Sequence, residues 1–158
     1  KPHPASLLIV GEIRAGEDKQ VFEEFRISNP DTRMIVTGYV PHHDLPAYYA
    51  LMDVFVHPSL RDGMPNALLE AMACSKAVIA TPVGGTVDVL DALRGVNGLT
   101  VPVHDAEALT RAIETLVTDE PLRKKLGQAA RQTIVEQFTP EKELEANLNI
   151  YRKLGIPS

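Results

Sequence analysis

Short apolar runs separated by amphipathic stretches fill the first hundred residues of this chain. Five such runs stop at a glycine, a proline or a polar turn, and they cover residues 6–11, 33–38, 54–56, 77–80 and 99–101. Continuous apolar runs of this length, bounded by turn signals, are typical of strands buried on both faces of a parallel sheet. The pattern therefore predicts five buried strands.

Between these runs, apolar residues recur at helical spacing. They predict helices over residues 17–27, 44–52 and 65–74, and a short helix after Gly84-Gly85. We expect Asp44 to cap the second of these, with Pro46 in its first turn.

Beyond residue 104 only the helical period remains, which predicts helices over residues 105–117, 120–137 and 140–153. Thr139-Pro140 is a suitable cap and first position for the last helix. Strands that alternate with helices predict right-handed βαβ crossovers. We therefore expect an α/β, Rossmann-like domain over residues 1–158, with a mostly parallel sheet flanked by helices and a helical C-terminal extension.

In a sheet of this kind, ligands bind beyond the carboxyl ends of the strands. The turns expected there are Gly11-Glu12, residues 38–41, residues 57–59, residues 82–85 and Val101-Pro102. Candidate binding residues are therefore sought on these turns.

Composition narrows the choice of partner. The chain has 158 residues, 44% of them hydrophobic, and a net charge of −5, which weighs against a nucleic-acid partner. Its single cysteine excludes an internal disulfide and a cysteine-based zinc cluster.

His42-His43-Asp44 is interpreted as a solvated turn, so no metal site is expected. Gly11 and Gly16 have P-loop spacing, but Glu17-Asp18 follows where that motif needs Lys and Ser or Thr.

The most informative stretch covers residues 62–73, Asp-Gly-Met-Pro-Asn-Ala-Leu-Leu-Glu-Ala-Met-Ala. It places one carboxylate, Asp62, in a loop and a second, Glu70, inside the following helix. The N–H groups at a helix start have no partner within the helix and can bind an anion or a polyhydroxylated group. A carboxylate can accept hydrogen bonds from a diol. This combination favours a nucleotide-sugar over a metal or a protein partner.

This stretch resembles the signature of family 4 glycosyltransferases, retaining enzymes of the GT-B fold, in which two glutamates are separated by seven residues. Four further motifs of the family are matched in order, at residues 56–59 (Val-His-Pro-Ser), 73–81 (Ala-Cys-Ser-Lys-Ala-Val-Ile-Ala-Thr), 83–86 (Val-Gly-Gly-Thr) and 97–102 (Asn-Gly-Leu-Thr-Val-Pro). Essentially the whole chain resembles the C-terminal, donor-binding half of such an enzyme.

The resemblance implies a role for each candidate residue. Asp62 would contact the hydroxyls of the donor sugar, and Glu70 the ribose; these two are the candidate catalytic residues. The remaining candidate binding residues are Tyr39 and Val40 at the base, Ser59 before the loop, Gly63, Met64, Pro65, Asn66 and Leu69 around the sugar pocket, and Gly84 and Gly85 near the diphosphate. The donor would be a UDP- or GDP-sugar, the acceptor a glycan, lipid or small molecule, and neither a cofactor nor a metal would be needed.

The chain also departs from the family pattern. Asp62 stands where the first Glu is usual, Ser75 where Gly is usual, Ala77 for a usual Pro and Asp88 for a common Glu. About two extra residues lie between Asp88 and Asn97. These differences leave the sugar and the level of catalysis open.

The resemblance implies that the family's N-terminal acceptor domain lies outside this sequence, and that Lys1-Pro2-His3-Pro4 follows the point where the family carries an Arg and a Lys that hold the pyrophosphate. We therefore expect this chain to bind nucleotide weakly and to be inactive alone, with residues 140–153 and Tyr151 packing against the missing domain. We expect a cytoplasmic protein, whose contact with a membrane surface would be peripheral and made through that domain.

Two alternatives remain open. One is a non-catalytic nucleotide-sugar-binding or interaction module of the same fold, to which the change to Asp62 lends support. The other is a UDP-sugar epimerase of the GT-B type, whose motifs differ from the signature at residues 62–70.

Overall fold

A computed structural model describes residues 5–13, 15–90 and 96–155 of the chain. The expected extra residues between Asp88 and Asn97 and the N-terminal segment Lys1–Pro4 fall largely or wholly outside these ranges. The chain divides into two compact units, residues 1–52 and residues 53–158. Each unit is described by itself.

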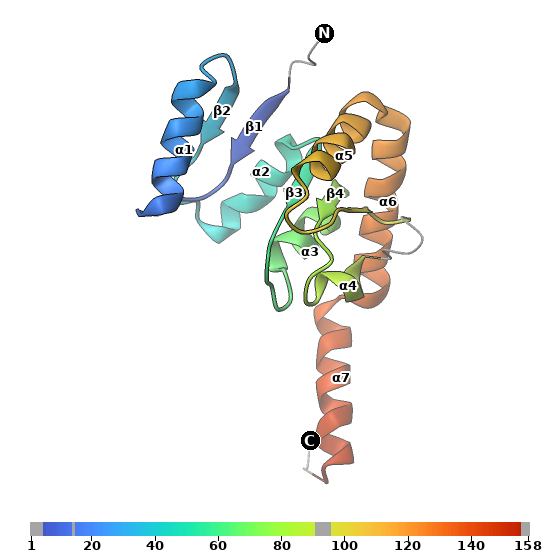
Figure 1. The fold of residues 1–158 in the computed structure, drawn as a ribbon. Coiled ribbons are helices and arrows are strands. Elements are labelled where there is room, and N and C mark those ends of the chain that lie inside the picture. Colours follow the sequence, from blue (N-terminus) through green and yellow to red (C-terminus); the bar gives the residue numbers. More distant parts are fainter. Residues whose placement is uncertain (1–4, 14, 91–95, 156–158) are drawn as a thin grey trace. The chain divides into compact units, whose positions relative to one another are not determined.

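Unit 1 holds a parallel strand pair joined by a helix. Its elements are β1 (Ser6–Ile9), α1 (Glu17–Ser28), β2 (Arg33–Val36), the 3₁₀ turn η1 (His42–Asp44) and α2 (Leu45–Leu51). β1 pairs with β2 in parallel, and α1 forms the crossover between them (Figure 1). Just beyond the strands, Gly11 and Gly38 form an isolated antiparallel bridge. The turns that follow both strands therefore lie together.

The strands of unit 1 are less buried than the sequence predicts. Leu7 on β1 is 48% exposed and Ile35 on β2 is 57% exposed. The physical reason is the small size of this sheet, because two strands and one crossover helix cannot cover both faces of the strands. Helix α1 has no buried residue, and its Val21 and Phe25 are themselves exposed. The expectation of buried strands is wrong for this unit.

The expected Asp44 cap is also wrong. Asp44 precedes α2 but makes no side-chain hydrogen bond to its first turn. Its backbone is helical, with φ −91° and ψ −16°, because the turn η1 runs directly into α2. A capping side chain needs an extended backbone to reach back to the helix N–H groups. Pro46 does lie in the first turn, as predicted.

Unit 2 contains a three-stranded parallel sheet and its helices. The elements are β3 (Val54–His57), α3 (Asn66–Ala73), β4 (Ala77–Ala80), α4 (Thr86–Val89), β5 (Leu99–Thr100), α5 (Ala106–Thr118), α6 (Glu120–Gln137) and α7 (Pro140–Lys153). The strand order is β3-β4-β5, with Phe55 opposite Val78 and Ile79 opposite Leu99. The α/β class, the parallel pairing and the helical C-terminal region are confirmed.

β4 is the centre of the core of unit 2. All four of its residues are buried, as expected for the middle strand of a parallel sheet covered on both faces. Ala77 and Ile79 share one face and pack with Val101, with Leu116 of α5 and with Leu126 of α6. This packing holds β4 and its neighbour β3 in place. The carboxyl ends of both strands, and the loops that begin there, are positioned as a result.

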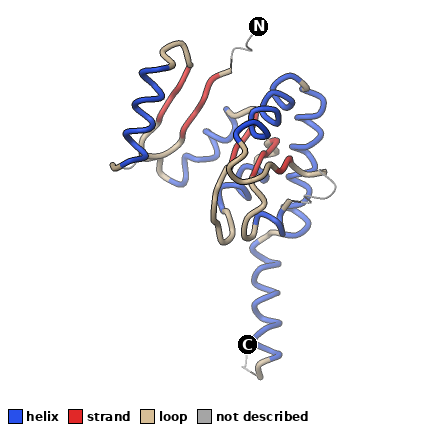
Figure 2. Tube along the Cα trace, in the orientation of Figure 1, coloured by secondary structure: helices blue, strands red, loops and turns tan. Residues whose placement is uncertain are grey.

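The last three helices begin at side-chain caps. Asp105 accepts from the N–H of Ala108, Asp119 from that of Leu122, and Thr139 from that of Lys142. The predicted pair of a Thr139 cap with a following proline is confirmed. Helix α7 then leaves the body of unit 2 as one continuous helix (Figures 1 and 2), and none of its residues is buried.

Candidate functional site

Two loops of unit 2 lie against each other at the carboxyl ends of neighbouring strands. Residues 58–65 connect β3 to α3, and residues 81–85 connect β4 to α4 (Figure 1). The N–H of Gly85 donates to the carbonyl of Gly63 at 2.6 Å. Gly84 has φ +50° and packs so closely on the Asp62 carbonyl that a Cβ atom would overlap it. The two glycines therefore fix the backbone of the loop that carries Asp62.

The start of the first loop is fixed by Thr81. Its N–H donates to the carbonyl of His57 at 3.3 Å, and its hydroxyl donates to the carbonyl of Ser59. The Ser59 hydroxyl in turn donates to the carbonyl of Arg61 at 2.9 Å. In this structure Ser59 thus forms a local turn, and its role toward a ligand stays a prediction.

Asp62 is held through its side chain as well. Its Oδ2 lies 2.8 Å from Nε2 of His57, and both side chains are partly buried, at 24% and 20% exposure. The imidazole stacks on Phe55, with ring centroids 6.3 Å apart and planes 12° from parallel. Strand alternation explains this stack, because residues two apart share a face.

The start of helix α3 supplies backbone donors beside this loop. Pro65 is buried and precedes the helix, and no side chain caps it. The N–H groups of Leu68 and Leu69 both donate to the Pro65 carbonyl. Helix geometry leaves those of Asn66 and Ala67 without an acceptor inside α3. Together with the helix dipole, they favour an anionic or hydroxyl-bearing group.

The structure brings Asp62, Gly63 and Met64 directly against Gly84 and Gly85. Met64 lies beside Gly85 and is 45% exposed. These are five of the residues implied by the resemblance, and they come from two separate motifs.

Glu70 and Leu69 lie further along α3. Both are half-buried, whereas the neighbouring Leu68 is fully buried in the core. Glu70 is four residues after the first residue of α3, which is about 6 Å along the helix axis. Its carboxylate is therefore placed beyond the first turn, and its contact with a ribose stays a prediction.

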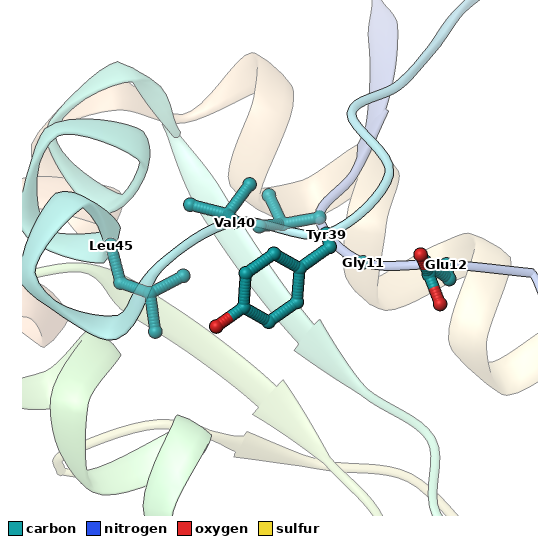
Figure 3. A pocket seen from close by; sticks show the side chains of 6 residues that line it. Gly11, Glu12, Tyr39, Val40 and Leu45 are labelled. Carbon is teal, nitrogen blue, oxygen red and sulfur yellow. The ribbon is translucent and has the colours of Figure 1, made fainter.

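Unit 1 contains a pocket of about 280 Å³ at the carboxyl ends of β1 and β2. Its lining residues are Val10, Gly11, Glu12, Tyr39, Val40 and Leu45. Figure 3 shows the Tyr39 ring between the side chains of Leu45 and Glu12. Tyr39 and Val40, the candidates for binding the base, thus line a real hollow with an aromatic face, apolar walls and one carboxylate.

Two residues at these sites were not among the sequence-based candidates. His57 lies in the motif at residues 56–59, but a lone histidine at the end of a strand is more often structural, so the sequence does not single it out; in the structure it contacts Asp62. Glu12 lies on a predicted strand-end turn, and that position was the available signal for it. The sequence thus predicted that the turn at Val40 and the loop at Asp62 carry binding residues. It did not predict that His57 contacts Asp62 or that Glu12 lines the pocket.

Across residues 5–13, 15–90 and 96–155, no three His, Cys, Asp or Glu side chains are grouped so that they would bind a metal ion. Over the same residues, no helix has the length and apolar character needed to cross a membrane.

The chain matches the family of glycosyl transferases group 1 over residues 1–133. It is 31% identical to the capsular polysaccharide biosynthesis glycosyltransferase CapM of Staphylococcus aureus, over 97% of this chain and 40% of that protein. The chain therefore spans well under half the length of this relative.

Solved structures of glycosyltransferases share the fold. Sucrose-phosphate synthase from Thermosynechococcus elongatus aligns with a TM-score of 0.82 and 30% identity, over 94% of this chain and 38% of that one. Anabaena HepE in complex with UDP aligns with a TM-score of 0.81 and 23% identity, over 98% of this chain and 42% of that one. The family match over most of the residues and the GT-B neighbours agree, and this chain belongs to the group 1 glycosyltransferases.

Proposed function

We propose that this chain is the C-terminal, donor-binding domain of a retaining family 4 glycosyltransferase that uses a UDP- or GDP-sugar. The observation that carries the proposal is the Asp62 loop, fixed on Gly84-Gly85 at the start of α3. It combines a partly buried carboxylate, which accepts from sugar hydroxyls, with backbone donors suited to a diphosphate.

The chemistry asked of this site is charge stabilisation. In glycosyl transfer, the bond between the anomeric carbon and the diphosphate oxygen breaks, and its electron pair stays on that oxygen, so negative charge collects on the departing diphosphate. The acceptor hydroxyl bonds to the same carbon and gives up its proton to the departing diphosphate. The N–H groups at the start of α3 and the helix dipole would stabilise that charge without reorganising.

The remaining roles follow the resemblance. Glu70 would accept from the ribose hydroxyls, and the pocket of Tyr39 and Val40 would hold the base. The solved HepE structures contain UDP and UDP-glucose, which supports a nucleotide-sugar as the ligand class. The identity of the acceptor is a matter for the rest of the polypeptide.

Catalysis is assigned to a longer protein. The chain spans 40% of CapM, and the resemblance places the acceptor site in another domain. We therefore propose that the isolated chain binds nucleotide weakly and without turnover, in a cytoplasmic enzyme whose contact with a membrane would be peripheral.

The test is an NMR titration of this chain with UDP and with GDP. We expect one nucleotide at millimolar concentration to shift the amide resonances of Val40, Gly63 and Asn66. The variant Glu70→Ala should weaken these shifts, because the ribose loses its acceptor. Glu107→Ala is the matched control, since Glu107 is a helix glutamate whose side chain is 89% exposed on α5. Equal weakening by both variants, or shifts elsewhere only, would contradict the proposal.

A further inference from the structure

We propose that His57 is a positioning residue for the donor sugar, acting through Asp62. Its imidazole holds one carboxylate oxygen so that the other is presented to a sugar hydroxyl. This inference rests on the proposed function, because it assigns the Asp62 carboxylate to the sugar. It concerns a residue that the family resemblance does not assign, and it explains how an aspartate serves at a position where glutamate is usual.

The backbone of Asp62 has little freedom. Its carbonyl is in contact with Gly84, and the next residue, Gly63, accepts the N–H of Gly85 at 2.6 Å. An aspartate has only two side-chain torsions beyond this fixed backbone. Its carboxylate can therefore reach a narrow region, which includes His57 at the end of β3.

His57 is itself fixed at both its backbone and its ring. It is the last residue of β3, where it pairs with Ala80, and its carbonyl accepts the N–H of Thr81. The ring is stacked on Phe55 and only 20% exposed. A side chain held in this way is preorganised, so little rotamer entropy is lost when it binds the carboxylate.

The hydrogen bond has a defined direction. An ionised carboxylate only accepts, so Nε2–H of His57 donates to Oδ2 of Asp62 over 2.8 Å. Charge-assisted bonds of this kind are about twice as strong as neutral ones. With Oδ2 bound, Oδ1 is the oxygen left to accept from the ligand. A glutamate would carry its carboxylate about 1.5 Å further along, past the imidazole, so His57 and Asp62 form a matched pair.

The first experiment needs no ligand. The ¹⁵N resonances of the His57 ring report which nitrogen carries the proton and whether it is hydrogen-bonded. We expect a protonated, hydrogen-bonded Nε2 in the native chain. Asp62→Ala should shift this resonance, while Asp44→Ala should leave it unchanged. Asp44 is the matched control because its carboxylate lies 3.6 Å from His43 on an exposed turn. If the ¹⁵N resonances of the His57 ring are the same in Asp62→Ala as in the native chain, the inference is overturned.

The second experiment isolates the sugar's contribution to binding. The dissociation constants of UDP and UDP-glucose, and of GDP and GDP-mannose, are measured for the native chain. We expect His57→Leu to weaken the nucleotide-sugar roughly tenfold, the size of one charge-assisted hydrogen bond, and to leave the free nucleotide unchanged. His57→Gln should recover part of the loss, because its amide is also a donor, and His43→Leu should have no effect.

A double-mutant cycle tests the matching. Asp62→Glu should weaken nucleotide-sugar binding about tenfold in the native background, yet cost little when His57 is already leucine. Additive losses, or a His57→Leu variant that binds the nucleotide-sugar as tightly as the native chain does, would overturn the positioning role. A native chain that binds neither free nucleotide would instead overturn the proposed function, whatever the state of the pair.

Discussion

Gly84 carries a steric requirement that only its lack of a side chain can meet. It combines φ +50° with direct contact between its Cα region and the Asp62 carbonyl. We expect Gly84→Ala to lower the free energy of unfolding by about 1–3 kcal/mol, because the new Cβ strains the backbone and pushes the loop away. Urea unfolding of the purified chain measures this.

Gly63→Ala is the matched control for stability. Gly63 lies in the partner loop, but a Cβ placed there would meet nothing within 4 Å, and its φ is not positive. Its unfolding midpoint should stay close to that of the native chain. Equal losses in the two variants would show that the contact between Gly84 and Asp62 is not what holds the loop.

At the scale of single residues, the sequence was a good guide to which residues lie at the site. It was a poor guide to which other residues they contact. Asp62 and Gly84 were both singled out by motifs, although 22 positions separate them and no local pattern states that they touch. His57 was not among the candidates, because its contact with Asp62 depends on the loop that returns Asp62 to the end of β3. Such contacts arise from tertiary packing, which periodicity and propensity do not encode.

Helix α3 ends in a motif that favours glycine but contains a serine. The N–H of Ser75 donates to the carbonyl of Met72, and that of Lys76 to the carbonyl of Ala71. This is the Schellman pattern, whose left-handed position is most often glycine. Ser75 occupies that position with φ +58° and is exposed. The departure from the family pattern at this position therefore has a structural cost.

We expect Ser75→Gly to raise the free energy of unfolding by about 0.5–1 kcal/mol, because it relieves the left-handed strain at the end of α3. The gain is measured by urea unfolding. Gly127→Ala provides the contrast: its Cβ would collide with the Ser75 carbonyl, so it should destabilise the chain. A destabilising Ser75→Gly would mean that the hydroxyl contributes more than the strain costs.

At the scale of elements, the order and type were predictable and the details of ends less so. Apolar runs identified the five strands, and helical spacing identified the long C-terminal helices to within a residue. The Thr139 cap follows local rules, so it was predicted correctly. Asp44 has the same chemistry, but the 3₁₀ turn before it removes the extended backbone that capping needs.

At the scale of the whole molecule, the two units differ in how much apolar surface they enclose. Unit 2 buries β4 completely, whereas unit 1 leaves Leu7, Phe25 and Ile35 exposed. The sequence predicted buried strands in both units. An apolar run shows that a segment is hydrophobic, but it does not show whether other helices or strands cover it.

Helix α7 should contribute little to the stability of this chain. None of its residues is buried, and Leu144, Ile150 and Tyr151 remain exposed along it. We expect deletion of residues 140–158 to change the midpoint of thermal unfolding by less than about 3 °C, since little apolar area returns to water. Leu126→Ala, in the buried core, should instead cost about 2–5 kcal/mol.

Calorimetry of the native chain, the 140–158 deletion and Leu126→Ala distinguishes two possible roles of α7, packing against another domain or packing against this chain. A deletion that leaves the melting transition in place shows that the apolar side chains of α7 are not needed for unit 2, and are available to pack against another domain of a longer polypeptide. The alternative is a loss as large as that of Leu126→Ala. That result would mean that α7 folds back onto this chain in solution, and it would contradict the expectation that the helix packs against another domain.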